Sequence, residues 1–87
     1  MTVVRIMVDG KPKATLSVDA AGRIAATGAD PVTALDLARH YAEQFVEEDG
    51  RDEATVTADE VLGRMLERCR GTRTWAEAGE TSEAASP

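Results

Sequence analysis

The first 27 residues alternate short runs rich in β-branched residues with tight turns, and this pattern restricts the fold more than any other feature of the chain. Residues 2–8, 13–19 and 23–27 have the composition of strands. The sequences DGKP and DAAG between them are turn signals, because glycine tolerates a positive φ. In the second run, apolar and polar residues alternate, which is typical of a strand with one buried face. The pattern predicts an antiparallel meander with one apolar face.

Two amphipathic helices are expected after the strands. The first follows Asp30, a good N-cap residue, begins at Pro31 and runs to about Glu48. At 100° per residue its apolar positions share one half of the helix: Ala34, Leu35, Leu37, Ala38, Tyr41, Ala42, Phe45 and Val46. The second helix begins with Thr57 and Glu60 in the spacing of a capping box. Its apolar stripe contains Val61, Leu62, Met65, Leu66 and Cys69.

These elements predict a single small α+β domain over residues 1–72, with a three-stranded antiparallel meander packed on two helices in the order β-β-β-α-α. Residues 73–87 have few apolar groups and are expected to form an acidic, mostly disordered C-terminal tail. The core is small, the sheet edges are free, and the outer sheet face is mixed in character. These three features predict a dimer or a complex with another protein, and a homodimer is favoured. The outer face is expected to carry Val3, Arg5, Met7, Thr15, Ser17, Arg23 and Ala25.

The net charge of −6 disfavours direct binding to nucleic acid and favours a basic protein partner. No apolar run approaches the roughly 20 residues that cross a bilayer, so no membrane association is expected. The first residues lack the basic and apolar segments of a signal peptide, which indicates a cytoplasmic protein. The richness in Gly, Ala, Asp and Arg, with no Asn, is typical of a bacterial or phage protein.

The chemistry-bearing residues are few, and no enzyme is predicted. His40 is the only histidine and is expected on the solvated side of the first helix, without a nucleophile or second histidine for catalysis or metal binding. Cys69 is expected to be a buried structural thiol, with a reactive or dimer-bridging thiol as the alternative. The glycines form no phosphate-binding motif. The chain is therefore expected to hold no cofactor and no metal.

Candidate partner-binding residues lie in four places. One is the acidic segment around residues 47–53, which either is a solvated loop or contacts a basic partner; it lacks the order of a calcium-binding loop. Another is the group of arginines that ends the second helix, where cations are favoured by the helix dipole or dock on an acidic surface such as a neighbouring subunit's 47–53 segment. The outer sheet face and Trp75 complete the set. The candidates are Trp75, Arg5, Met7, Glu43, Glu47, Glu48, Asp49, Arg64 and Arg68.

Trp75 is the only tryptophan and lies in the predicted tail, where two roles are open to it. Either the first tail residues fold back so that the indole covers an edge of the core, or Trp75 is the aromatic anchor of a short linear motif. The first is favoured, because Trp75 follows the second helix by only a few residues.

The segment TGADPVTALDLARHYAEQF after a strand meander resembles HicB-like antitoxins, with Asp30, Ala34, Leu35 and Ala38 at the matching positions. The chain departs from that family where Val32 and Thr33 replace its usual acidic pair, and it shows no C-terminal DNA-binding module. No functional residue is carried over. The resemblance implies the broader class of small acidic bacterial or phage proteins that inhibit a larger partner, as antitoxins and anti-CRISPR proteins do.

Two functions follow as expectations. The first is a non-enzymatic protein–protein interaction module, homodimeric. The alternative is a small acidic inhibitor of a basic nucleic-acid-handling protein, acting through surface charges that mimic phosphates.

Overall fold

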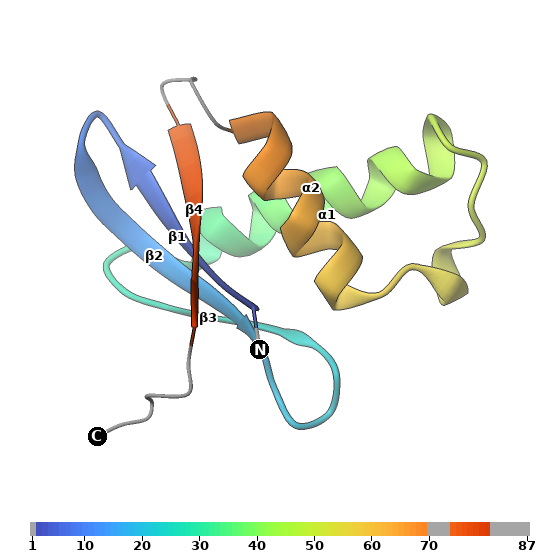
Figure 1. The fold of residues 1–87 in the computed structure, drawn as a ribbon, viewed down its shortest axis with the longest axis horizontal. Helices are drawn as coiled ribbons and strands as arrows, with labels where there is room; N and C mark the ends of the chain where they lie inside the picture. The colour runs from blue at the N-terminus through green and yellow to red at the C-terminus, as the bar shows by residue number, and fades with distance from the viewer. Residues whose placement is uncertain (1, 70–73, 81–87) are drawn as a thin grey trace.

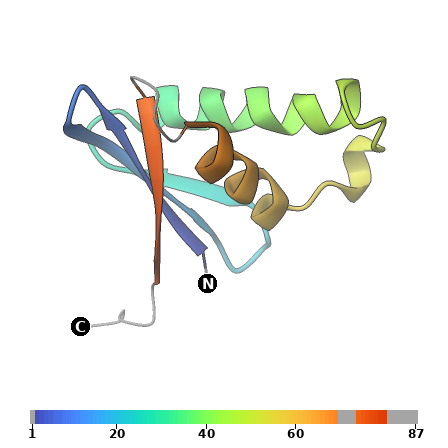
Figure 2. The same ribbon diagram turned by 45° about the horizontal axis from the view of Figure 1, so that its top comes forward.

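A computed structural model describes residues 2–69 and 74–80 and contains one antiparallel sheet with two helices on one of its faces (Figures 1 and 2). The predicted α+β fold, with three antiparallel strands followed by two helices, is confirmed. The elements in chain order are β1 (Thr2–Val8), β2 (Lys11–Val18), β3 (Ile24–Thr27), α1 (Pro31–Glu47), the 3-10 turn η1 (Glu53–Thr55), α2 (Ala58–Cys69) and β4 (Thr74–Glu80).

The turns of the meander follow from the residues predicted to form them. Asp9 and Gly10 both have positive φ, 53° and 79°, as a tight turn between β1 and β2 requires. Between β2 and β3, the Asp19 carboxylate accepts hydrogen bonds from the N–H groups of Ala21 and Arg23, both at 2.9 Å. The aspartate thereby satisfies backbone donors that the turn leaves without strand partners.

A fourth strand, β4, completes the sheet, and the sequence did not predict it. The strand order is β3-β2-β1-β4, so β1 is central and β4 is an edge strand (Figure 1). β4 pairs antiparallel with β1, with Trp75 opposite Met7 and Glu77 opposite Arg5. This strand occupies part of the segment expected to be a disordered tail; residues 81–87 lie outside the described residues. The backbone at Trp75 folds back onto the domain, as one of its two predicted roles requires, and its indole lies outside the described part.

The core lies between the sheet and the helices. α1 packs against β2 and β3, and α2 packs against β1 and β4. The buried side chains are Val4, Ile6, Ala14, Leu16, Ala34, Ala38, Phe45, Val61, Leu62, Met65 and Cys69. The predicted apolar side of α1 is wider than the surface that it buries, since Leu35 and Val46 remain 37% and 38% exposed.

Both helices begin as the sequence predicted. The Asp30 carboxylate accepts from the Thr33 N–H at 3.2 Å. Hydrogen bonds from the Thr33 side chain and from its N–H lower the pKa of Asp30. In the capping box of α2, Glu60 accepts from the Thr57 N–H at 2.9 Å, and Thr57 accepts from the Glu60 N–H at 3.2 Å. These bonds satisfy N–H groups that the first helical turn would otherwise leave unpaired.

Candidate functional site

The acidic segment between the helices is ion-paired to arginines of the same chain. Arg64 Nη2 donates to Asp49 Oδ2 at 2.5 Å, and Arg68 Nη1 donates to Glu48 Oε1 at 3.3 Å and to Gln44 Oε1 at 3.1 Å. The arginines of α2 were expected either to have a structural role at the helix end or to dock on an acidic surface. Arg64 and Arg68 contact the acidic segment of their own domain. These ion pairs join the C-terminal end of α1 to α2. They also neutralise part of the negative charge that was predicted for the acidic segment.

Arg64 also covers the aromatic ring of Phe45. Its guanidinium carbon lies 3.7 Å from the ring centroid, and the side chain is only 14% exposed. This is the geometry of a cation–π contact. The side chain of Arg64 thus shields the Phe45 ring from solvent and binds Asp49 at the same time. The ion pair therefore helps to cover the edge of the core.

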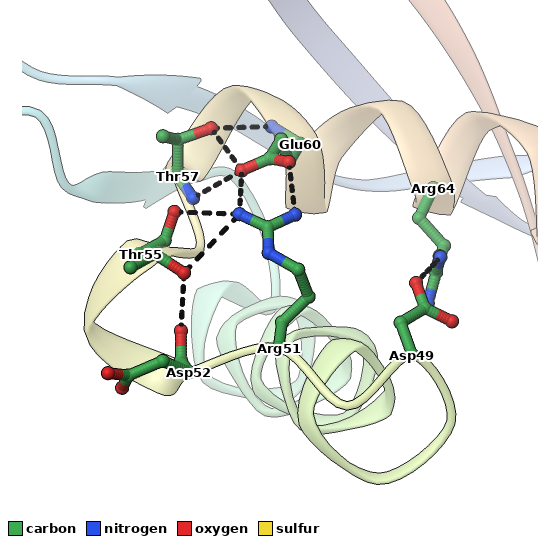
Figure 3. A network of polar contacts seen from close by, with 7 residues as sticks. All are labelled: Asp49, Arg51, Asp52, Thr55, Thr57, Glu60 and Arg64. Carbon is green, nitrogen blue, oxygen red and sulfur yellow. Dashed lines mark hydrogen bonds and ion pairs between the residues drawn. The ribbon is translucent and has the colours of Figure 1, made fainter.

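Arg51, which the sequence did not single out, connects the loop to the start of α2 (Figure 3). Its two terminal nitrogens donate to the two oxygens of Glu60, at 2.7 and 3.3 Å, and one of them also donates to the Thr55 carbonyl at 2.9 Å. The bond from Arg51, together with that from the Thr57 N–H, lowers the pKa of Glu60 to about 2. Glu60 therefore caps α2 and holds the preceding loop through one carboxylate.

The Glu60 contact makes the protein sensitive to acid. A depressed pKa in the folded state means that the ionised carboxylate stabilises the fold above its ordinary pKa of 4.5, and that this contribution is lost as the pH falls through about 2. We expect Glu60→Gln to lower the melting temperature at pH 7, and the difference from wild type to shrink steadily between pH 5 and pH 2. Thermal unfolding followed by circular dichroism over this pH range measures the difference.

Glu67→Gln provides the control, because Glu67 is exposed on the same helix. Its melting temperature should stay close to that of wild type throughout. A Glu60→Gln deficit that persisted undiminished at pH 2 would mean that the ionised carboxylate is not the source of the stabilisation.

Two of the acidic candidates on α1 stay exposed. Among residues 2–69, Glu43 and Glu47 have no ion pair, whereas Asp36 approaches Arg39 to 3.9 Å with both side chains mostly in solvent. Glu43 and Glu47 therefore keep their negative charge at the surface of α1, where they line a hollow together with Glu53 of the loop.

The face of the sheet opposite the helices carries the other candidates. Val3 and Met7 of β1 are half-buried there, Arg5 between them is exposed, and no described helix packs on that side (Figure 2). The polar neighbours Thr15 and Ser17 of β2 lie opposite Arg5 and Val3 in the strand register. A hollow of about 250 Å³ adjoins them, and its lining includes Arg5, Pro12 and Thr15. We call this surface the open sheet face.

His40 and Cys69, the histidine and the cysteine of the chain, lie outside the open sheet face and the ion-paired loop. His40 is exposed and lies 3.3 Å from the Gln44 amide nitrogen. Cys69 is buried, as predicted, and its thiol donates to the Tyr41 hydroxyl at 3.6 Å. Burial, together with the Cys69 contact, raises the pKa of Tyr41 to about 12. In residues 2–69 and 74–80 there is no group of three metal-binding side chains.

No helix in the described ranges is long and apolar enough to cross a membrane. Comparisons with protein families, with curated proteins and with solved structures gave no match to this chain.

Proposed function

We propose that the protein is a non-enzymatic interaction module that pairs with a second copy of itself through the open sheet face. The observation that carries this proposal is the half-buried pair Val3 and Met7 on a sheet face against which no described element packs. A domain of this size has a small core, and covering a second sheet face adds buried apolar surface to it. The composition and the single cysteine agree with a cytoplasmic protein of bacterial or phage origin.

The distribution of charge favours contact through this face. Exposed acidic groups lie on the helical layer, for example Asp36, Glu43 and Glu47. On the open sheet face, Arg5 lies opposite Glu77 in the register of β1 and β4, so one cationic and one acidic position are neighbours there. Two acidic molecules that meet through their open sheet faces keep their helical layers far apart, which limits the repulsion between them.

The size of the face sets the expected strength of the dimer. With strands about 4.8 Å apart and about 3.3 Å per residue, a four-stranded face of this length presents roughly 400 Å² per copy. That lies at the small end for specific interfaces. We therefore expect a dissociation constant on the order of micromolar, with monomer and dimer in exchange.

A matched pair of valine substitutions tests the proposal. Val3→Glu places a charge on the open sheet face, where two copies would bring like charges together, and is expected to weaken dimerisation at least about tenfold. Val32→Glu makes the same change on α1, where the side chain is 67% exposed and far from that face, and should leave dimerisation unchanged. Sedimentation equilibrium of both variants and of wild type measures the dissociation constant.

Ser17→Glu supplies a second change on the same face, because Ser17 is the register partner of Val3 on β2 and is polar already. Circular dichroism of each variant establishes that it is folded. A wild-type protein that sediments as a monomer at several hundred micromolar would overturn the proposal. So would a dimer that both Val3→Glu and Ser17→Glu leave intact.

The alternative function, inhibition by phosphate mimicry, keeps only the exposed carboxylates of α1, Asp36, Glu43 and Glu47, as its candidates. Asp49, Glu48 and Glu60 are each ion-paired to an arginine of the same chain, so these carboxylates present little net negative charge to a basic partner.

A further inference from the structure

A cavity of about 300 Å³ opens between the start of α1 and the adjoining ends of β1 and β2. Its interior is apolar and is formed by Ile6, Val8, Ala34 and Leu37. The polar residues of its lining are Lys13, Asp30 and Thr33. A cavity of about 150 Å³ accepts benzene, so this one has room for a branched aliphatic or aromatic side chain.

The walls of the cavity are held in place by the backbone. The Asp30 N–H donates to the Lys13 carbonyl at 2.9 Å, which ties the start of α1 to β2. Just before it, Gly28 lies so close to β2 that no side chain would fit between them. Because both walls are fixed without a ligand, binding would require little ordering of the chain.

Two opposite charges lie at the cavity without neutralising each other through direct contact. Within the described residues Lys13 makes no ion pair, although its charge favours the ionised form of Asp30. One carboxylate oxygen of Asp30, Oδ1, accepts from the Thr33 N–H. The Thr33 side chain bonds to the same carboxylate. Two carboxylate oxygens accept up to about four hydrogen bonds, so Asp30 can also accept from a ligand ammonium while the Lys13 ammonium binds a ligand carboxylate.

We propose that this cavity binds an apolar α-amino acid, with its side chain inside, its α-carboxylate on Lys13 and its α-ammonium on Asp30. An apolar monocarboxylate would satisfy Lys13 but would bring its negative charge to Asp30. An apolar amine would satisfy Asp30 but would bring its positive charge to Lys13. Only the zwitterion matches both charges and the apolar interior, since each charge-assisted hydrogen bond then has a partner of opposite sign. Lys13 also lines the hollow beside the open sheet face, but the apolar interior of the cavity lies under α1, on the helical side of the sheet.

Titration of the ¹⁵N-labelled protein with leucine and phenylalanine, followed by amide chemical shifts, tests the proposal. We expect saturable shifts centred on Thr33, Ala34 and Leu37, with a dissociation constant on the order of 1 mM for a ligand of this size. 4-Methylpentanoate and isopentylamine each lack one of the two charges of leucine, and glycine lacks the side chain. Each should bind at least about tenfold more weakly.

Charge-reversal substitutions at two lysines of β2 test whether Lys13 is the residue that binds the carboxylate of the ligand. Lys13→Glu should weaken leucine binding at least about tenfold. Lys11→Glu, an equally exposed lysine of the same strand that does not line the cavity, should leave binding unchanged. Equal binding of leucine and isopentylamine, unchanged binding to Lys13→Glu, or shifts that never saturate would overturn the proposal. The amide spectrum of each variant shows that its fold is retained.

Discussion

Replacement of Leu62 by alanine is expected to remove most of the protein's free energy of unfolding at 25 °C. Leu62 lies on α2 with 0% exposure. Removing such a side chain costs about 2–5 kcal/mol, because the cavity that it leaves is only partly refilled. A core of this size supplies in total only about 3–5 kcal/mol of stability, so one substitution uses most of it. Urea unfolding followed by circular dichroism measures the free energy of both proteins.

The control is the same change at Leu35, which is 37% exposed on α1. Leu35→Ala removes the same atoms from a site in contact with solvent and should cost less than about 1 kcal/mol. Similar losses for the two variants would mean that α2 does not pack on the sheet as described.

The second large effect is expected at Gly28, which directly follows β3 and lies two positions before the N-cap of α1. A Cβ at this position would lie 2.8 Å from the Cα of Ala14 and 3.0 Å from the carbonyl oxygen of Lys13. Its φ of 119° is also a conformation that residues with a side chain rarely adopt. Backbone strain and overlap together predict that Gly28→Ala costs about 3 kcal/mol or more, measured by urea unfolding.

Gly22→Ala separates the two causes. Gly22 has a similar positive φ of 82°, but nothing lies within 4 Å of the Cβ that alanine would add. The free energy of unfolding of this variant should fall by only about 1 kcal/mol, the cost of a positive φ for alanine. If Gly28→Ala lost no more than Gly22→Ala, the close approach of β2 to the start of α1 would be wrong.

The strands and helices of residues 2–69 were predictable because their signals are local. Turn residues, alternation, the N-cap at Asp30 and the capping box of Thr57 and Glu60 each depend on neighbours a few positions away. The apolar width of α1 was overestimated, because a helical wheel gives the angle of each residue but not the width of the surface opposite. Leu35 and Val46 lie at the margins of the stripe, where the sheet does not reach them.

β4 could not be predicted from the same signals. Its sequence, TWAEAGE, is rich in alanine, glutamate and glycine, residues with low strand propensity. Its pairing with β1 joins positions at opposite ends of the chain, and no pattern within a short window reports such a contact.

The candidate site could be predicted only in part, because its contacts also join residues that are far apart in the sequence. The sequence showed the acidic segment and the arginines of α2, but not that they face each other across the loop. Arg64 and Asp49 are 15 positions apart and meet because the loop between the two helices brings α2 back against the end of α1. Arg51 gave no signal at all, since its role depends on reaching Glu60 nine positions later.

The pairing of the first strand with the last has a consequence for translation. While the ribosome is still making the chain, β2 can pair with β1, but the other side of β1 has no partner until Glu80 has been added. Throughout that interval the nascent chain exposes a row of unpaired N–H and C=O groups along its most apolar strand. On a polysome, neighbouring nascent chains expose the same unpaired edge of β1. Pairing between the β1 strands of two chains then competes with the pairing of β1 and β4 within one chain.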